Sequence, residues 1–366
     1  MKIAIHISHP EQFHLFKNVI AQLRTQNHSV IITYNEKDVL GELISSSEFA
    51  SIAYKVNARK NIDSIWHLMH QFLQKEIGLY KELCKHKPDI LVGNSIALAH
   101  IGKFMSRPSI IINQDDFDLI HLTANIGYPF ASTILCPDVC RTGKFKKKSI
   151  QYPASHALAY LHPKYFSPNE ETAKKYVDTT VPFYILRLVK LSAHHDIGIN
   201  GINDALAEKI CERLSKSGNV FISAERKLSN SLEKYRLKID PSHIHHLMSF
   251  ADLFISDSQG MSEEAEILGT PTIRYTDFAG RMSFLEELEI KYQLGFSFKP
   301  PSTKNLFDKI EQILNMHNVK SVWTERKNKM LADKIDLASF LSWFIGNYPE
   351  SKHILAGDDS YILNFK

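Results

Sequence analysis

Residues 251–277 read ADLFISDSQGMSEEAEILGTPTIRYTD, and this stretch decides the fold. Residues 253–255 form a continuous apolar run, which predicts a strand that is covered on both faces of a parallel sheet. Asp257, Ser258 and Gly260 then predict a tight turn and a helix start. Aspartate and serine accept hydrogen bonds from free backbone N–H groups, and glycine allows a close approach.

Gly269 and Pro271 predict that this helix ends before a second strand. A strand that leads through a polar turn into a helix can bind an anion, because the first helical N–H groups lack acceptors and the dipole is positive there. Glu263 or Glu264, one turn into the helix, could accept hydrogen bonds from ribose hydroxyls. The alternative is that the turn residues only cap the helix and that the glutamates are solvated.

The segment SDSQGMSEEAEILGTPTIR, residues 256–274, resembles the nucleotide-binding motif of the UDP-N-acetylglucosamine 2-epimerases, D-S-G-G-x-Q-E-E-A…L-G-x-P. The matching residues are Asp257, Ser258, Gly260, Glu263, Glu264, Ala265, Leu268, Gly269 and Pro271. The resemblance implies an α/β GT-B-like fold, in which two Rossmann-like, doubly wound parallel-sheet domains face a cleft and a C-terminal helix crosses back. It also implies that Ser258 and Gly260 hold a diphosphate and that Glu264 holds the ribose.

Gln259 departs from this motif, since the 2-epimerases have a glycine at its position. A side chain there could narrow the phosphate pocket or donate its amide to a phosphate, and the sequence leaves both open. Gln259 is therefore included among the candidate nucleotide-binding residues.

The start of the chain predicts a βαβ unit, with strands at residues 2–7 and 29–34 around an amphipathic helix. No G-x-G-x-x-G follows the first strand, and no metal-ligand spacing stands out, so we expect neither an NAD nor a metal cofactor. His9 and Glu11 follow the first strand, at the edge where open α/β sheets bind ligands. His9 stands where the 2-epimerases have an arginine and could act as a general base; the alternative is a surface residue at a helix start.

Polar residues also follow the predicted strand at residues 109–112, and Asp115 is our candidate for acid–base chemistry among them. A solvated loop is the alternative. The 2-epimerases carry acidic residues in these strand-end loops, whereas this chain has Asn94 at the first such place and only Gln114 or Asp115 near the second. An amide cannot ionise, so the chain departs from the epimerase acid set.

The second half is predicted to open with a strand at residues 183–188 and a loop that contains A-H-H-D. The 2-epimerases place a T-A-H-R-R-E-N turn here, and this chain resembles it in A-H and in position. Arg187, His194 and His195 could donate to a diphosphate; the alternative is that the histidines are structural. LRLVKLSAHHDIG and the opening MKIAIHISHPEQFHLFKNVI are more similar to an uncharacterised bacterial and archaeal family related to these enzymes.

The length of 366 residues suits two domains. We expect an N-terminal acceptor or catalytic domain at residues 1–165, a nucleotide-sugar-binding domain at 166–346 and a tail at 347–366. Residues 137–168 suit an interdomain connection, residues 61–87 suit a helix, and residues 322–344 suit one long closing helix.

With 44% hydrophobic and 23% charged residues, the composition is that of a globular protein without a transmembrane segment or signal peptide. The formal charge of +4 does not indicate nucleic acid. The four unpaired-looking cysteines and this composition predict a cytoplasmic protein. Lys144, Lys146, Lys147 and Lys148 form one basic run, which is either a solvated loop or a contact to an anionic glycan or to the inner membrane surface.

The sequence thus predicts an enzyme that uses a nucleotide-sugar, a UDP-sugar by resemblance, in surface polysaccharide synthesis, with a glycan or small molecule as acceptor. Two alternatives stay open: a UDP-N-acetylglucosamine 2-epimerase-type enzyme, and a nucleotide-sugar-binding protein without catalysis.

Overall fold

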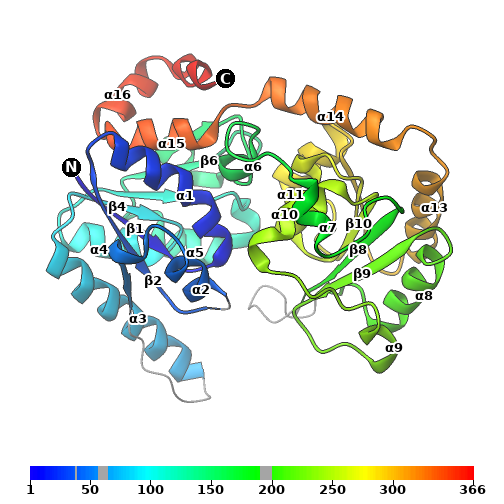
Figure 1. Cartoon of the computed structure of the whole chain (residues 1–366). Helices are drawn as coiled ribbons and strands as arrows, with labels where there is room; N and C mark the ends of the chain where they lie inside the picture. The colour runs from blue at the N-terminus through cyan, green and yellow to red at the C-terminus, as the bar shows by residue number, and fades with distance from the viewer. Residues whose placement is uncertain (38, 57–64, 190–199) are drawn as a thin grey trace. The chain divides into compact units, whose positions relative to one another are not determined.

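The computed structural model describes residues 1–37, 39–56, 65–189 and 200–366. The chain forms two compact units, the first made of Met1–Tyr160 with Ile335–Lys366 and the second of Leu161–Lys334. Each unit contains a parallel sheet flanked by helices (Figure 1). The predicted class, α/β with two doubly wound parallel sheets, is confirmed.

The described residues of the first unit form a seven-stranded sheet in the order β3-β2-β1-β4-β5-β6-β7, and every pairing is parallel. Its strands are β1 (Lys2–Ile7), β2 (Ser29–Tyr34), β3 (Ala53–Lys55), β4 (Ile90–Gly93), β5 (Ser109–Ile112), β6 (Thr133–Pro137) and β7 (Ser149–Tyr152). The order reverses between β1 and β4. Ligands of open α/β sheets bind beside the carboxyl ends of the strands at such a reversal.

The helical elements of the first unit are α1 (Pro10–Thr25), α2 (Leu40–Ser45), η1 (Ala50–Ile52), α3 (Ile65–His86), α4 (Ile96–Phe104), α5 (Phe117–Gly127), η2 (Gly143–Lys148), α6 (Leu158–Leu161, across the unit boundary), α15 (Leu337–Gly346), α16 (Glu350–Gly357) and η6 (Asp359–Phe365). Helix α1 forms as predicted, because it buries one apolar face that includes Phe13, Phe16 and Leu23. Helix α15 packs against α1, so the C-terminal part of the chain does return to the first unit.

The predicted single closing helix at residues 322–344 is wrong. The chain instead forms α14 (Val319–Asp333) and α15, with a break between them. Asp336 causes the new start, because its side chain accepts a hydrogen bond from the Ser339 N–H at 3.0 Å and caps α15.

The interpretation of residues 137–168 as a connection is also corrected, since they include β7, which pairs with β6 as the last strand of the first sheet. An apolar run does not predict β7, because its sequence, Ser-Ile-Gln-Tyr, mixes polar and apolar residues, and an edge strand needs no continuous apolar run. Residues beyond 346 carry no clear sequence pattern, yet they fold as α16 and η6 on the first unit.

The second unit has a five-stranded parallel sheet within its described residues, in the order β12-β11-β10-β8-β9. Its strands are β8 (Phe183–Leu188), β9 (Asn219–Ala224), β10 (Leu253–Ser256), β11 (Thr272–Tyr275) and β12 (Gly295–Phe298). The order reverses between β8 and β10, and every residue of β10 is buried, as the apolar run predicts. The segment after β10 therefore begins at the reversal of this sheet.

The other elements of the second unit are α7 (Glu170–Lys174), α8 (Asp204–Leu214), α9 (Asn230–Glu233), η4 (Pro241–His243), α10 (Ile244–Phe250), α11 (Gln259–Leu268), α12 (Ser283–Glu286), η5 (Glu287–Lys291), α13 (Thr303–Leu314) and α14. None of the helices formed by the described residues combines the length and hydrophobicity that crossing a bilayer requires.

Candidate functional site

The turn between β10 and α11 has the predicted geometry. Ser258 is the N-cap of α11, and its side-chain oxygen accepts a hydrogen bond from the Met261 N–H at 3.4 Å. The Ser256 hydroxyl accepts one from the Ser258 N–H at 2.7 Å. Gly269 ends the helix at a φ of 82°, a backbone conformation that favours glycine. The helix start at the sheet reversal therefore presents N–H groups without helical acceptors, which suit an anion.

The glutamates of α11 are buried, so the expectation that they are solvated is wrong, whereas the alternative that the turn residues only cap the helix stays open. Glu263, Glu264 and Glu266 are 1%, 8% and 0% exposed. Glu264 makes an ion pair with His245 of α10, with 3.1 Å between its Oε1 and the histidine Nε2. A carboxylate in so little water requires polar partners, and Glu264 has one that holds its orientation.

The Gln259 side chain turns back into the protein rather than outward. Its Oε1 accepts a hydrogen bond from Nη1 of Arg274 in β11, and its Nε2 donates to the Asp257 carbonyl at 3.3 Å. The sequence left two roles open for the Gln259 side chain: narrowing the phosphate pocket, or donating its amide to a phosphate. These contacts favour neither role. They make Gln259 a link between the turn and the strand behind it.

Arg274 is fully buried and holds a second partner, Glu289 of η5. Its Nε and Nη2 donate to Oε1 of Glu289 at 3.0 and 2.8 Å, while the other Glu289 oxygen accepts from the Ser297 hydroxyl at 2.6 Å. Glu266 lies beside this network, and burial, followed by the charge of Glu289, raises its pKa well above the ordinary value. A buried polar network of Arg274, Glu289 and Ser297 therefore lies behind the turn and is joined to it through Gln259.

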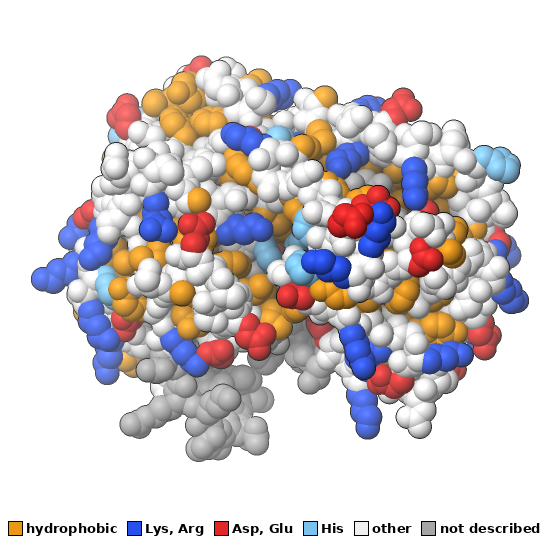
Figure 2. Space-filling model, in the orientation of Figure 1, with side chains coloured by type: hydrophobic (Ala, Val, Ile, Leu, Met, Phe, Trp, Pro, Cys, Tyr) orange, Lys and Arg blue, Asp and Glu red, His pale blue; other side chains and the backbone are white. Residues whose placement is uncertain are grey.

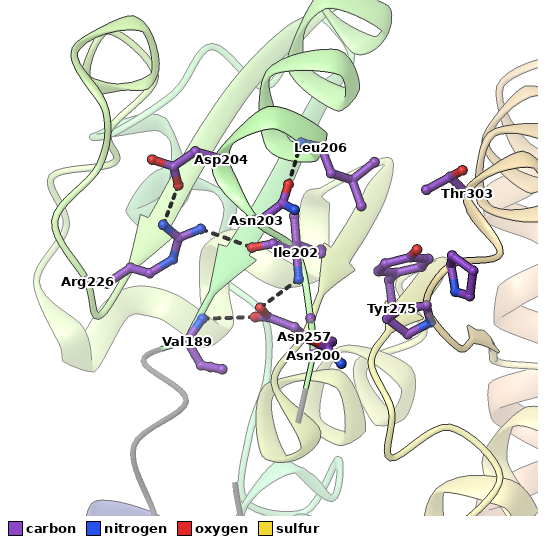
Figure 3. Close-up of a pocket in the computed structure, with 13 residues that line it drawn as sticks. Val189, Asn200, Ile202, Asn203, Asp204, Leu206, Arg226, Asp257, Tyr275 and Thr303 are labelled. Atoms are coloured by element: carbon purple, nitrogen blue, oxygen red, sulfur yellow. Dashed lines mark hydrogen bonds and ion pairs between the residues drawn. The ribbon is translucent and has the colours of Figure 1, made fainter. Parts of the chain in front are cut away.

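Asp257 fixes the backbone next to the turn. Its two carboxylate oxygens accept hydrogen bonds from the N–H of Val189, at 2.9 Å, and of Ile202, at 3.2 Å (Figure 3). Burial raises its pKa to about 6, although these two hydrogen bonds act in the opposite direction. Asp257 joins the ends of two segments to the carboxyl end of β10.

A cavity of about 870 Å³ lies beside Asp257, at the carboxyl ends of the strands of the second sheet (Figure 3). Tyr275 and Pro300 line one side, and Asn203, the N-cap of α8, lines another. Arg226 lines the cavity as well and forms an ion pair with Asp204. The volume suits a ligand of nucleotide size, because ligand pockets commonly measure about 300–1,000 Å³.

Of the remaining candidates in the second unit, Arg187 is joined to the turn through its backbone, because its carbonyl accepts a hydrogen bond from the Asp257 N–H at 3.4 Å. Arg187 of β8 donates to the Ser223 hydroxyl at 2.8 Å and pairs with Glu225, so its guanidinium is directed toward the end of β9. His194 and His195 lie outside the described residues. The assignment of these three residues to a diphosphate stays a prediction.

In the first unit, the structure brings together residues that follow β1 and β5. His9 is the N-cap of α1, and its Nδ1 accepts a hydrogen bond from the Glu11 N–H at 3.4 Å. Oε1 of Glu11 accepts one from Nε2 of Gln114, also at 3.4 Å. Oε1 of Gln114 in turn accepts from the His156 N–H at 3.0 Å. Three sequence-distant segments therefore meet at the carboxyl edge of the first sheet.

Asp115 lies beside a different group. It borders a narrow gap with Phe117 and Tyr128, and its charge is the second cause, after burial, of the raised pKa of Tyr128. The described contacts join Asp115 to Asn113, whose amide donates to the Asp115 carbonyl at 2.9 Å.

His156 was not a candidate from the sequence. It is 4% exposed, burial lowers its pKa to about 3, and its Nε2 has no hydrogen-bond partner among the described residues. Only its position inside the apolar stretch YPASHALAYL, residues 152–161, could have marked it as a buried histidine. Among the residues that the structure describes, no group of three or more His, Cys, Asp or Glu side chains is arranged to hold a metal ion.

A family model described as "Protein of unknown function (DUF354)" matches residues 1–284. No curated protein matches the chain in sequence. Among solved structures, the UDP-GlcNAc 2-epimerase from Methanocaldococcus jannaschii has a TM-score of 0.62 at 17% identity, covering 91% of this chain and 99% of its own.

Two further solved structures contain ligands by their titles. The UDP-GlcNAc 2-epimerase from Neisseria meningitidis, bound to UDP-GlcNAc, has a TM-score of 0.63 at 16% identity and covers 97% of this chain and 100% of its own. The Streptomyces sp. SF2575 glycosyltransferase SsfS6, complexed with thymidine diphosphate, has a TM-score of 0.58 at 11% identity and covers 95% and 100%. The fold is GT-B-like, as predicted; identities this low extend the similarity to the fold alone.

Proposed function

The chain belongs to the DUF354 family, whose description assigns no function, and we propose that it is an enzyme that transfers a sugar from a nucleotide-sugar to an acceptor. The donor is a UDP-sugar, and the acceptor is a glycan or small molecule of surface polysaccharide synthesis. The observation that carries this proposal is the turn from β10 into α11, where Ser258 caps the helix and Glu264 is buried against His245.

The donor's diphosphate would bind at the start of α11. The N–H groups around Gly260 and the Ser258 hydroxyl can donate to phosphate oxygens, and the positive end of the helix dipole favours their charge. During transfer the bond between the sugar and the diphosphate breaks, and negative charge grows on the leaving group. Donors fixed in advance by a helix stabilise that charge without having to reorganise.

Glu264 would then accept hydrogen bonds from the ribose hydroxyls. The solved structures with this fold include complexes with UDP-GlcNAc and with thymidine diphosphate, which supports a nucleotide as ligand. The adjacent cavity of about 870 Å³ offers the room that a nucleotide needs.

The first unit would activate the acceptor. His9 is our candidate general base, since an imidazole can remove a hydroxyl proton near neutral pH, and Glu11 and Asp115 are the candidate carboxylates. The Glu11 carboxylate is oriented by Gln114, which in turn is held by the backbone of His156. The positions of these groups at the carboxyl edge of the sheet support a catalytic role.

One observation favours a second candidate function, nucleotide-sugar binding without catalysis. Asn94 follows β4 at the place where the 2-epimerases have an acid, and an amide cannot exchange a proton as a carboxyl does. The same observation weighs against the 2-epimerase reaction as the activity of this chain.

Calorimetric titration with UDP tests the nucleotide site. We expect micromolar binding by the wild type and at least about a tenfold loss for Ser258→Ala and for Glu264→Ala, since a hydrogen bond to a charged group is worth about 1.5–3 kcal/mol. Glu212→Ala changes an exposed glutamate of the same unit and is the matched control. Failure of UDP and of the other nucleoside diphosphates to bind would refute the proposal. If UDP binds and His9→Ala turns over UDP-sugars as fast as the wild type, the assignment of His9 as base is wrong.

A further inference from the structure

Helix α5 and the turn after it expose a row of large apolar side chains. Leu122, Ile126 and Phe130, here called the α5 stripe, are 66%, 47% and 47% exposed. Leu122 and Ile126 are one helical turn apart and share a face, while Ala124 and Gly127 of the same helix are buried. Burial of Ala124 in the core fixes the orientation of α5, so the stripe faces outward as a consequence of the fold.

The basic run singled out in the sequence lies in η2, which packs against both ends of α5. Phe145 anchors η2 in the core, with its ring centroid 6.0 Å from that of Phe117 and 5.3 Å from that of Tyr128, the residues that begin and follow α5. Around this buried anchor, Lys144, Lys146 and Lys147 are exposed. The segment that carries these lysines is therefore held against the two ends of α5 by a packed aromatic side chain.

Lys148, the last lysine of the basic run, and Lys352 of α16 bind the backbone around Phe130. Nζ of Lys148 donates to the carbonyls of Pro129 at 2.5 Å and of Ala131 at 3.2 Å, on either side of Phe130. Lys352 of α16 donates to the Ser132 carbonyl at 2.8 Å. Burial, and after it the charges of Lys352 and of Lys103 in α4, lower the pKa of Lys148.

Acidic side chains contribute little to this surface. Residues 117–132 and 141–149 contain one acid, Asp118, against Arg141 and four lysines, and Asp118 pairs with Arg141 at 2.9 Å. Glu76 of α3 is paired with His100, whose ring packs on Phe130. Figure 2 shows basic and acidic side chains among hydrophobic ones at the end of the first unit where α3 and α4 lie.

The surface is separate from the candidate site. Phe130 precedes β6 and Lys148 precedes β7, so both lie at the amino ends of the strands, whereas His9 and Glu11 lie at the carboxyl end of β1. Phe104, which precedes β5 and is 75% exposed, extends the apolar surface at the same edge.

We propose that the α5 stripe and its surrounding lysines dock the first unit onto an anionic phospholipid membrane. Exposed apolar side chains can insert between lipid headgroups while lysines beside them contact phosphates, and each contribution alone is weak. A second copy of the chain suits the surface poorly, because symmetric pairing would bring like charges together.

Vesicle sedimentation of the full chain tests this proposal. We expect binding to vesicles that mix phosphatidylglycerol with phosphatidylcholine and little binding to phosphatidylcholine alone. Neutralising Lys144, Lys146 and Lys147 together, each to Gln, should reduce partitioning about 100-fold, since each lysine near an anionic surface contributes roughly fivefold. The matched control neutralises Lys216, Lys227 and Lys238, three exposed lysines of the second unit.

The apolar part has its own test. Leu122→Gln with Ile126→Gln should weaken vesicle binding and leave the melting temperature unchanged, whereas Ile290→Gln with Leu363→Gln, exposed residues elsewhere, should leave binding unchanged. The proposal is overturned if the wild type ignores anionic vesicles or if the α5 variant binds them like the wild type. It is also overturned if light scattering shows a wild-type dimer that this variant converts to a monomer, because the stripe would then be an interface between copies.

Discussion

Arg274 donates a hydrogen bond to the side-chain oxygen of Gln259, although Arg274 lies in β11 and Gln259 lies in the first turn of the preceding helix, α11. Arg274 is fully buried, and its remaining donors engage Glu289. Gln259, the position at which this chain departs from the 2-epimerase motif, therefore supplies a hydrogen-bond acceptor to the buried guanidinium of Arg274. The departure and the buried arginine belong together.

Replacing Gln259 by glycine should consequently destabilise the protein, even though it restores the motif. The variant leaves a buried Arg274 N–H without its acceptor, and an unsatisfied buried donor costs about 1–3 kcal/mol. Thermal unfolding of Gln259→Gly beside Gln259→Glu, which keeps an acceptor oxygen, provides the measurement. Equal melting temperatures for the wild type and Gln259→Gly would contradict the structural role of this contact.

Glu266→Gln should stabilise the protein at neutral pH. Glu266 is fully buried, its two oxygens have no hydrogen-bond partner among the described residues, and its pKa is raised well above 4.5. For a raised carboxyl pKa, stability is full below the unfolded value and is lost as the pH rises toward the folded value. The advantage of the variant should grow from about pH 4.5 upward and reach about 1 kcal/mol or more.

Denaturant unfolding at several pH values, with Glu212→Gln as the exposed control, measures this difference. Gly295→Ala is a companion test, because a Cβ at Gly295 would lie 2.0 Å from Oε1 of Glu266. We expect this substitution to destabilise the protein. A wild type that is more stable than Glu266→Gln at pH 8 would show that the carboxylate is ionised and paired.

Asp257→Asn should remove a pH-dependent part of the stability. Burial raises the pKa of Asp257 from 3.8 to about 6, so the wild type loses stability from this group as the pH rises through that interval. The shift corresponds to about 3 kcal/mol at most. The stability of the wild type minus that of Asp257→Asn should therefore fall between about pH 4 and pH 6 and stay level above it.

The same substitution exchanges one acceptor oxygen for an amide nitrogen, and it disturbs the bond from Val189 or from Ile202. The lost hydrogen bond changes the difference in unfolding free energy between the two proteins by the same amount at every pH. A difference that does not change with pH would exclude the titration of Asp257 as its cause.

His245 should determine how well the nucleotide site distinguishes ribose from deoxyribose. If the Glu264 carboxylate accepts from the ribose hydroxyls, its ion pair with His245 fixes the carboxylate in the required orientation. His245→Leu should weaken UDP binding about tenfold, the value of one hydrogen bond to a charged group, and change 2′-deoxy-UDP binding less. Calorimetry with both ligands measures the ratio of affinities.

His246→Leu is the matched control, because His246 lies on the same helix and packs on Phe166 instead of Glu264. It should leave the ratio of affinities unchanged. If His245→Leu lowers the affinity for UDP and for 2′-deoxy-UDP by the same factor, His245 is a purely structural residue. Absence of UDP binding by the wild type would refute the nucleotide site itself.

The α/β class, both parallel sheets and the strand, turn, helix and strand at residues 251–277 follow from the sequence alone. These features depend on neighbouring residues: the apolar run of β10, the cap at Ser258 and the glycine at 269 each act within a few positions. The similarity to the 2-epimerase motif lies in the same local stretch. The return of the C-terminal part of the chain was expected, but its break at Asp336 was not, because one capping bond decides it.

Only the tertiary structure decided which side chains meet. Glu11 and Gln114 are 103 residues apart, and the Gln259 side chain turns to Arg274 in the next strand, which no local pattern encodes. The burial of Glu263, Glu264 and Glu266 likewise depends on α10 and β12 packing over α11, and the basic run gains an apolar neighbour only when Phe145 packs on α5. Local sequence determines where strands and helices begin, whereas burial and the partners of charged groups arise from contacts between elements that are distant along the chain.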